Sequence, residues 1–386
     1  MFHCHIAFFL GLTVVQLLLP LSAANPQCTD LTLTVTATAS NNVFPIPTDL
    51  NYSNPGAVSA FVQTIIGDGN SVYPLVPTGG TFKISARYCE PQVNVTSRTN
   101  TVQILVSGVT ENKLYWSGLS YPVGYNGDMY SWIAYASSQG YPTLSIDRLG
   151  TGNSTHPDPI VQLQVNLETA VIHQIVLQLK SGTAVSGRKF TKVIFAGHSY
   201  GSVLGNNLAT NNPTDIAAYV LTGYGVSIIP VAVDLPQVGL FPAALYSPRF
   251  AGFPLGYLVT ASAPGRRGYL WGAPGSFDTG IFQMDYNDED VVGLGELLSI
   301  GGGLKEAPNY TGAVFVVTGS RDDVFCLGGL CPIGSASPQA MSGALYPKAS
   351  NFSYSEPIGT GHMINLHYTA QQSFKASFDF LAANGF

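Results

Sequence analysis

The spacing of hydrophobic residues along the chain changes near residue 101. Before this point, two segments alternate between apolar and polar residues, at 31–39 and 81–90, and one helical pattern lies between them at 57–66. Strict alternation is typical of strands with one face in solvent. After this point, short apolar runs without alternation predict strands that are buried on both faces. These runs are 101–106, 141–146, 189–195, 216–222 and 312–319.

Helical patterns separate the later strands. Apolar residues recur with helical spacing in 128–139, 160–180, 201–211 and 373–385. Strands that alternate with helices predict an α/β fold, in which a mostly parallel central sheet is flanked by helices. The alternation stops between 226 and 312, where Pro, Gly and aromatic residues are frequent. We interpret this stretch as a cap or lid, inserted between the sixth and seventh strands.

The N-terminus reads as a secretory signal peptide. Residues 6–21 are almost wholly apolar and are followed by the small residues Ser22, Ala23 and Ala24 of a cleavage site. No Lys or Arg precedes the apolar run, so an uncleaved signal anchor is the alternative. No later run is apolar for 18 residues, so we expect a secreted, extracellular protein with no stable membrane span after signal removal.

The predicted organisation has four parts. They are a signal peptide at 1–24, the first part of the core at 25–225, the cap at 226–312 and the rest of the core at 313–386.

Cysteine usage agrees with secretion. Once Cys4 is removed with the signal, four cysteines remain, and an even number in a secreted chain indicates two disulfides. Of the three possible pairings we predict Cys28–Cys89, which ties two N-terminal strands, and Cys326–Cys331, which closes a tight loop. Zinc binding is the alternative for four cysteines, but no C-x-x-C pair occurs.

Five Asn-x-Ser/Thr sites are candidates for glycosylation in a secreted protein. They are Asn51, Asn94, Asn153, Asn309 and Asn351.

Composition excludes two classes of function. Charged residues make up 10% of the chain, against roughly 25% in an average soluble protein, and 46% of residues are hydrophobic. The chain is therefore not a disordered, highly charged one. With 16 basic and 22 acidic residues the net charge is -6, so no basic excess exists to bind nucleic acid. No motif indicates a metal or an organic cofactor.

The segment from Gly197 to Gly201 carries the strongest chemical signal. Gly197-His198-Ser199-Tyr200-Gly201 fits G-x-S-x-G and lies between a buried strand and an apolar helix. This is the setting of a nucleophile elbow, in which small flanking residues allow a sharp turn. Ser199 then projects from the N-terminus of a helix, where negative charge is stabilised.

A serine nucleophile needs a base and an acid that orients the base. In folds with this elbow the order along the chain is Ser, acid, His. Only two histidines follow Ser199, and we predict that His362 in a Gly-rich loop is the base, with His367 as the alternative. The acid is predicted at Asp322, three residues after the strand 312–319 ends, with Asp323 as the alternative.

Two backbone N–H groups are expected to form the oxyanion hole. One belongs to Tyr200, which follows the nucleophile. The other is expected in the loop after the strand 101–106, where Val109 is the best candidate and Gly108 allows a close approach of the backbone.

The order of these segments resembles the α/β-hydrolase superfamily. The segments are SGVT after a strand, Asp147-Arg148-Leu149-Gly150-Thr151-Gly152-Asn153-Ser154 after the next strand, GHSYG, VVTGSRDD and GTGH. Within the superfamily the chain looks like secreted fungal members with a cap between the sixth and seventh strands. One departure is Ser107, where the oxyanion loop commonly has His. The resemblance implies hydrolysis of esters, amides, lactones or epoxides, and a serine at 199 disfavours the reactions that use a carboxylate nucleophile.

The first functional hypothesis is a secreted serine hydrolase. It would cleave a carboxylic ester or lactone of a neutral, apolar substrate, so its partner would be a small-molecule or lipid-like ester. Aromatic residues of the cap are expected to line the cleft. They are Phe241, Tyr246, Phe250, Tyr257, Tyr269 and Trp271.

Three alternatives stay open. A secondary-metabolite tailoring hydrolase, acyltransferase or lactonising enzyme would use the same triad. A prolyl-aminopeptidase-like peptidase would need acids for a free amino terminus, for which the cap offers Asp285, Asp288, Glu289 and Asp290. A non-catalytic binding domain is the third, although such domains usually lose the nucleophile or the histidine.

Overall fold

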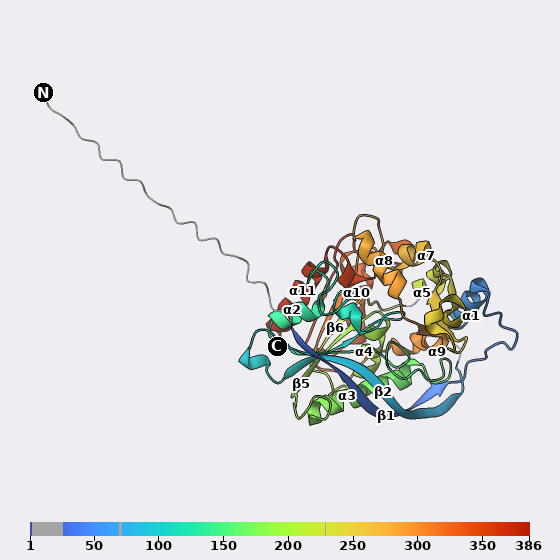
Figure 1. Cartoon of the computed structure of the whole chain (residues 1–386), viewed down its shortest axis with the longest axis horizontal. Coiled ribbons are helices and arrows are strands. Elements are labelled where there is room, and N and C mark those ends of the chain that lie inside the picture. The colour runs from blue at the N-terminus through green and yellow to red at the C-terminus, as the bar shows by residue number, and fades with distance from the viewer. Residues whose placement is uncertain (2–25, 69–71, 228) are drawn as a thin grey trace.

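A sheet of eight strands forms the centre of the protein (Figure 1). The computed structural model describes Met1 and residues 26–68, 72–227 and 229–386, so the predicted signal peptide at 1–24 lies, apart from Met1, outside the described residues. The strand order is β1-β2-β4-β3-β5-β6-β10-β11. The pairs β1–β2 and β2–β4 are antiparallel, and the pairs from β4 to β11 are parallel. The predicted α/β-hydrolase fold with a mostly parallel sheet is confirmed.

The strands of the large sheet follow the predicted order along the chain. Their bounds are β1 Gln27–Asn42, β2 Leu75–Glu90, β3 Thr101–Val106, β4 Thr143–Ile146, β5 Lys192–His198, β6 Ala218–Thr222, β10 Ala313–Val317 and β11 Asn351–Ser355.

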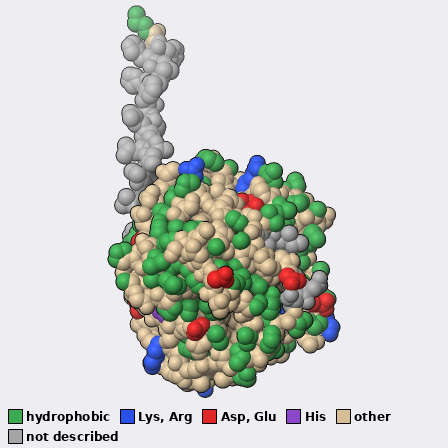
Figure 2. Space-filling view, turned by 90° about the vertical axis from the view of Figure 1, so that its right-hand side faces the viewer, with side chains coloured by type: hydrophobic (Ala, Val, Ile, Leu, Met, Phe, Trp, Pro, Cys, Tyr) green, Lys and Arg blue, Asp and Glu red, His purple; other side chains and the backbone are tan. Residues whose placement is uncertain are grey.

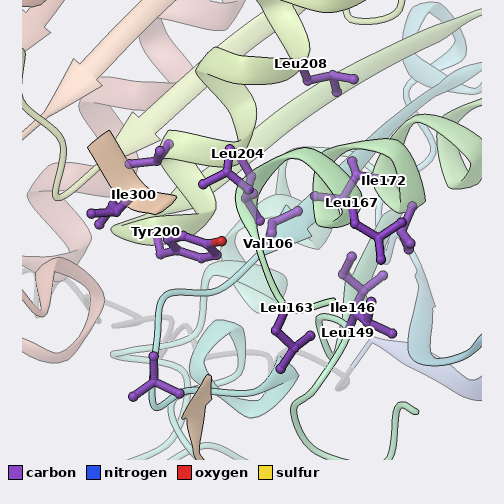
Figure 3. Close-up of a cluster of buried hydrophobic side chains, with 14 of the residues drawn as sticks. Val106, Ile146, Leu149, Leu163, Leu167, Ile172, Tyr200, Leu204, Leu208 and Ile300 are labelled. Carbon is purple, nitrogen blue, oxygen red and sulfur yellow. The ribbon is translucent and has the colours of Figure 1, made fainter. Parts of the chain in front are cut away.

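Helices cover both faces of this sheet. α2 (Trp132–Ser138) and α11 (Ala370–Ala383) lie on one face, and α3 (Val165–Ser181) and α4 (Tyr200–Asn211) lie on the other (Figure 1). Side chains of β3 alternate between the two layers, because Val102, Ile104 and Val106 pack with α3 and α4 while Leu105 packs with α2 and α11. This two-sided burial explains why the mostly apolar sequence of β3 does not show the alternation of a half-exposed strand. Figure 3 shows part of the apolar layer between the sheet and the helices α3 and α4, where Val106 and Leu204 face α3.

Local hydrogen bonds set helix ends that the hydrophobic pattern places elsewhere. The pattern predicts a helix from 160, but the carboxylate of Asp158 accepts the N–H groups of Ile160 and Val161 in a turn, and α3 begins at Val165. The helix predicted at 128–139 begins later as well. The hydroxyl of Ser131 caps it by accepting the Ala134 N–H at 3.1 Å.

One strand of the large sheet is missing from the sequence prediction. β11 is short and its sequence, NFSYS, is mostly polar. It lies at the edge of the sheet and pairs only with β10, in parallel register. An edge strand needs little apolar surface, so its hydrophobic signal is weak.

The segment between β6 and β10 forms a separate layer over the C-terminal ends of the strands. It contains a three-stranded sheet of β7 Leu240–Pro242, β8 Tyr257–Thr260 and β9 Val292–Gly293. Its helices are α5 Ile229–Asp234, α6 Ala243–Tyr246, α7 Ala263–Leu270, α8 Thr279–Asp288 and α9 Leu294–Ser299. β6 and β10 are the sixth and seventh strands of the large sheet in chain order, as predicted for a cap.

Two further helices lie outside these layers. α1 (Pro55–Gly67), which the predicted organisation assigns to the core, packs against α5, α9 and β7 of the cap. The other is α10 (Pro338–Met341), a single turn before β11.

The described chain has both predicted disulfides. Cys28–Cys89 joins residues that face each other on β1 and β2, and Cys326–Cys331 closes a loop of the chain after β10. Within the described ranges, no helix has the length and apolar character needed to cross a membrane. On the face shown in Figure 2, hydrophobic and uncharged polar side chains predominate, and charged ones are scattered.

A buried ion pair and a buried hydrogen bond join the cap to the core at two places. Arg148, in the loop after β4, pairs with Glu168 of α3 at 2.7 Å and with Glu296 of α9 in the cap. Arg266 of α7 binds Asp285 and Glu289 within the cap, and donates to the hydroxyl of Thr110 in the core at 2.9 Å. Because these groups are buried, each charge depends on its partners for solvation.

We expect Arg148→Met to lower the free energy of unfolding by about 3–5 kcal/mol, because it leaves two buried carboxylates without their cation. Lys375→Met is the matched control, since Lys375 and Asp379 form an ion pair with both side chains about two-thirds exposed, at 68% and 65%. The control should change the free energy by less than about 1 kcal/mol. Urea unfolding of both variants measures the difference, and equal midpoints would contradict a structural role for Arg148.

Candidate active site

Ser199 lies in the sharp turn between β5 and α4. Its backbone has φ 54° and ψ −121°, a conformation that a residue with a side chain rarely adopts. The turn is held because the Ser199 N–H donates to the Thr222 carbonyl at 2.9 Å, while the Ser199 carbonyl accepts the Ser202 N–H at 2.8 Å. Strain of this kind is typical of functional sites.

The two glycines of the elbow have no room for a side chain. A Cβ atom at Gly197 would lie 2.8 Å from the Gly201 carbonyl oxygen, and one at Gly201 would lie 2.2 Å from the Val106 carbonyl oxygen. Both distances are shorter than a carbon–oxygen contact allows. The requirement for small residues at both positions therefore comes from the backbone of β3 and of the elbow itself.

Asp322 and His362 are in contact. His362 Nδ1 lies 2.8 Å from Asp322 Oδ2, and both side chains are buried. The other oxygen, Asp322 Oδ1, accepts the N–H groups of Val324 at 2.9 Å and Phe325 at 3.1 Å. With its carboxylate fixed in this way, Asp322 holds the imidazole so that Nε2 is the nitrogen left for chemistry. Among the described residues, neither His362 Nε2 nor Ser199 Oγ has a hydrogen bond.

Asp323, the alternative acid, and His367, the alternative base, form hydrogen bonds with other groups. Asp323 Oδ2 accepts from the amide of Gln237 at 3.1 Å, and burial, followed by the charge of Asp234, raises the Asp323 pKa. His367 Nε2 lies 3.1 Å from the Gly361 N–H, and its Nδ1 lies 2.7 Å from the Met363 carbonyl oxygen. Burial lowers the pKa of His367. His367 thus shapes the loop that carries His362, and Asp323 faces the cap.

The predicted oxyanion donors are both without an acceptor among the described residues. These are the backbone N–H groups of Val109 and Tyr200, the latter at the first turn of α4. Gly108 lies against the nucleophile, because a Cβ atom there would be 2.8 Å from Ser199 Cβ. Its carbonyl accepts from Arg148 Nη2 at 3.0 Å. The loop is therefore fixed beside Ser199 by a buried cation.

Glu111 is a site residue that the sequence prediction missed. Its Oε2 accepts the Gly108 N–H at 2.8 Å, and its Oε1 lies 3.4 Å from Nε2 of the buried His198. Burial raises the pKa of Glu111 to about 8, against the effect of the Gly108 N–H. His198 stacks on Tyr115, with ring centroids 4.5 Å apart. An acidic residue three positions after Gly108 was the only signal available in the sequence.

Three of the four cap acids that could bind a free amino terminus already pair with groups of the protein itself. Asp285 and Glu289 pair with Arg266, and Asp290 accepts from the Asn112 side chain at 3.1 Å and the Gly152 N–H at 2.9 Å. Among the described residues, no group of His, Cys, Asp and Glu is arranged to hold a metal ion.

The six aromatic residues of the cap were expected to line the cleft, and most of them do not. Most of them pack inside the protein, and of the six only Phe250 lines the large cleft between the cap and the core. Trp271 contacts Phe277, Phe282 and His367, so it supports the loop of the predicted base.

Comparison with known proteins identifies the family. Residues 104–371 match the profile described as "Alpha/beta hydrolase family". The structure resembles the epoxide hydrolase VrEH1 from Vigna radiata, with 16% identity over 78% of this chain and 95% of that one and a TM-score of 0.51. It also resembles the enol-lactonase from Burkholderia xenovorans LB400, with 16% identity over 78% of this chain and 97% of that one and a TM-score of 0.51. No curated protein matches the sequence. At these identities the two structures establish the fold alone.

The contact between Asp322 and His362 predicts which acid matters. Asp322→Asn should lower kcat by roughly three orders of magnitude, because the amide favours the wrong tautomer of His362. Asp323→Asn should lower kcat by less than about tenfold, because Asp323 does not touch the imidazole. Steady-state kinetics of the two variants on one ester provide the comparison. A larger loss in the Asp323 variant would reverse the assignment.

The position of Glu111 predicts an alkaline limit to activity. Below about pH 8 its carboxyl group is neutral; above it, a negative charge forms beside the oxyanion loop and opposes the charge that develops on the substrate. We expect kcat to fall as pH rises through about 8 in the natural protein, and the fall to disappear in Glu111→Gln. Glu306→Gln, at an exposed position, is the control. The same alkaline fall in all three proteins would rule out Glu111 as its source.

Proposed function

Because the chain belongs to the alpha/beta hydrolase family, we propose that it is a serine hydrolase that cleaves a carboxylic ester or lactone of a neutral substrate. The observation that carries the proposal is the buried contact of 2.8 Å between Asp322 and His362, at the same edge of the sheet as the strained turn of Ser199. A serine, an acid and a base, which follow one another in this order along the chain, are the groups that acyl transfer requires.

The proposed reaction has two halves. Ser199 Oγ attacks the carbonyl carbon and gives its proton to His362, while the N–H groups of Val109 and Tyr200 stabilise the oxyanion. The bond to the alcohol breaks, and His362 returns the proton to the leaving oxygen. Water then attacks the acyl-enzyme by the same path and releases the acid, which restores Ser199. In this scheme Asp322 keeps the imidazole oriented and stabilises its charged form.

The environment of the site favours a neutral ester. The side chains of Ser199, Asp322 and His362 are buried, and the nearby charges already have partners of opposite sign. A charged substrate group placed there would lose its hydration without gaining a free counter-ion.

We also propose that the protein is secreted and glycosylated. Two disulfides support this, since such bonds persist in oxidising compartments. All five predicted glycosylation residues are exposed, as attachment of a glycan requires. They are Asn51, Asn94, Asn153, Asn309 and Asn351.

Covalent labelling tests the proposed nucleophile directly. A fluorophosphonate probe should label the natural protein and not Ser199→Ala, and hydrolysis of p-nitrophenyl acetate should fall at least about a thousandfold in that variant. Ser202→Ala is a matched control, because Ser202 lies in the first turn of α4, three residues after Ser199, with its hydroxyl bound to the Thr222 carbonyl at 2.9 Å. Labelling that persists in Ser199→Ala, or is absent from the natural protein, would contradict the proposal.

A further inference from the structure

Large aliphatic side chains are exposed in the loop that follows the predicted acid. The disulfide Cys326–Cys331 closes this loop, and within it Leu327 is 54% exposed and Leu330 is 63% exposed. Ile333, two residues beyond the disulfide, is 69% exposed. Leucine and isoleucine are usually buried, and one exposed side chain of this kind has no particular meaning. Several on one short segment mark a surface that contacts another apolar body.

Two other segments place exposed aliphatic residues beside this loop. Ser320 binds the residues on both sides of Ile358, and its carbonyl accepts the Cys331 N–H at 3.3 Å. In the cap, Asp234 Oδ2 accepts the Gly328 N–H at 3.4 Å, which brings α5 to the same place. We call the five exposed residues of these segments the apolar rim. They are Val233, Leu327, Leu330, Ile333 and Ile358.

The apolar rim has little charge around it. No Asp, Glu, Lys or Arg occurs at 324–347. Arg321, Asp234 and Glu356 lie at the border, and both of these acids already accept backbone N–H groups. A surface that binds anionic lipids needs several basic residues close together, and this border offers one beside two carboxylates. A neutral apolar phase therefore fits the apolar rim better than an anionic membrane does.

The side chains of the apolar rim suit a fluid phase better than a protein partner. All five are aliphatic, whereas the centres of protein interfaces are enriched in Tyr, Trp, Phe, Met and Arg. The disulfide Cys326–Cys331 and the bond from the Gly329 N–H to the Cys326 carbonyl, at 3.0 Å, hold the loop of the two leucines in place. Contact therefore requires little further ordering of this loop. A liquid rearranges around such side chains, whereas a protein would need a matching hollow.

The predicted glycans leave the apolar rim uncovered. Asn94, Asn309 and Asn351 lie at the N-terminal ends of β3, β10 and β11, on the edge of the sheet opposite to Asp322. Asn153 lines the large cleft between the cap and the core, and no residue of the apolar rim lines this cleft. A glycan is bulky and hydrophilic, so one at the apolar rim would keep an apolar phase away.

The apolar rim continues the segment that holds the acid and base. Asp322 Oδ1 accepts the N–H groups of Val324 and Phe325. The ring of Phe325 is buried, and its centroid lies 5.9 Å from that of the His362 imidazole. Leu327, two residues later, is already exposed. A phase in contact with the apolar rim therefore lies at the same edge of the sheet as the predicted catalytic groups.

We propose that the apolar rim docks the protein on the surface of a water-insoluble neutral lipid ester, and that this phase supplies the substrate. The identity of the substrate rests on the proposed serine hydrolase function, whereas the docking does not. Docking raises the concentration of the protein at the surface of the phase. The rate on an emulsion therefore depends on the apolar rim more strongly than the rate on a dissolved ester.

Flotation of Ser199→Ala on trioctanoin droplets measures docking without hydrolysis. Replacing both Leu327 and Leu330 with Ser in this background should lower the partition coefficient at least about tenfold, because apolar area is lost from the contact. Replacing both Leu75 and Leu177 with Ser is the matched control, since these leucines are exposed on β2 and α3. The control should keep the partition coefficient within about twofold.

Kinetics with an active Ser199 connect docking to the substrate. The change of Leu327 and Leu330 to Ser should lower the ratio of the rate on the trioctanoin emulsion to the rate on dissolved p-nitrophenyl acetate at least about fivefold. Labelling by the fluorophosphonate shows that the variant is folded. If the double variant is not labelled, Ile333→Ser, outside the disulfide loop, provides the same test with an expected fall of about threefold.

Three results would overturn the docking proposal. One is an unchanged partition coefficient in the leucine variants. Another is stronger binding to vesicles of phosphatidylserine than to trioctanoin, because charge then drives the contact. The third is a dimer in analytical ultracentrifugation that the leucine changes dissociate, because a second copy then covers the apolar rim.

The docking proposal and the hydrolase proposal fail in different ways. If the fluorophosphonate labels Ser199 and p-nitrophenyl acetate is hydrolysed, but the protein does not float with the droplets, docking is wrong and the serine hydrolase stands. If the protein floats through the apolar rim but takes up no label and hydrolyses neither ester, the hydrolase function fails and docking stands.

Discussion

The guanidinium group of Arg148 is the interaction on which the arrangement around Ser199 depends. It donates to the carbonyl of Gly108, pairs with Glu168 of α3 and Glu296 of the cap, and lies 4.9 Å from the ring centroid of Tyr200. The hydroxyl of Tyr200 in turn donates to Glu168 at 2.7 Å. One buried cation thus connects the loop of Gly108, the helix α4 that follows Ser199, the helix α3 and the cap. Such a group is stable only while all of its partners are present, so these four parts keep one relative position.

The low content of charged residues does not show that several of them are buried. Only 10% of residues are charged, yet several of them are buried near the site, where Arg148 pairs with Glu168 and Glu296 and where Glu111 lies beside Gly108. In this dry setting each charge acts over a longer range than it would in water. The raised pKa of Glu111, about 8, is a direct result of that burial. The electrostatics of the site come from a small number of enclosed groups rather than from the surface.

Local signals predicted much of the core and of the candidate triad region. β3 was predicted at its observed bounds because both of its faces are buried, and the elbow was evident because Gly197 and Gly201 are sterically required. The contact of Asp322 with His362 follows from the places where β10 and β11 end. Glu111, the lining of the large cleft between the cap and the core, and the partners of the cap acids were not predicted. Their roles arise from contacts between segments far apart in the sequence, and these leave no periodic pattern.

The ion pair and the hydrogen bond between cap and core limit how this protein can diverge. Glu296 belongs to the cap and Arg148 to the core, and Arg266 of the cap reaches Thr110 beside the oxyanion loop. Recombination that brought in a cap without these partners would leave a cation or a carboxylate buried and unpaired near Gly108 and Ser199. Cap and core loops are therefore expected to have changed together during evolution.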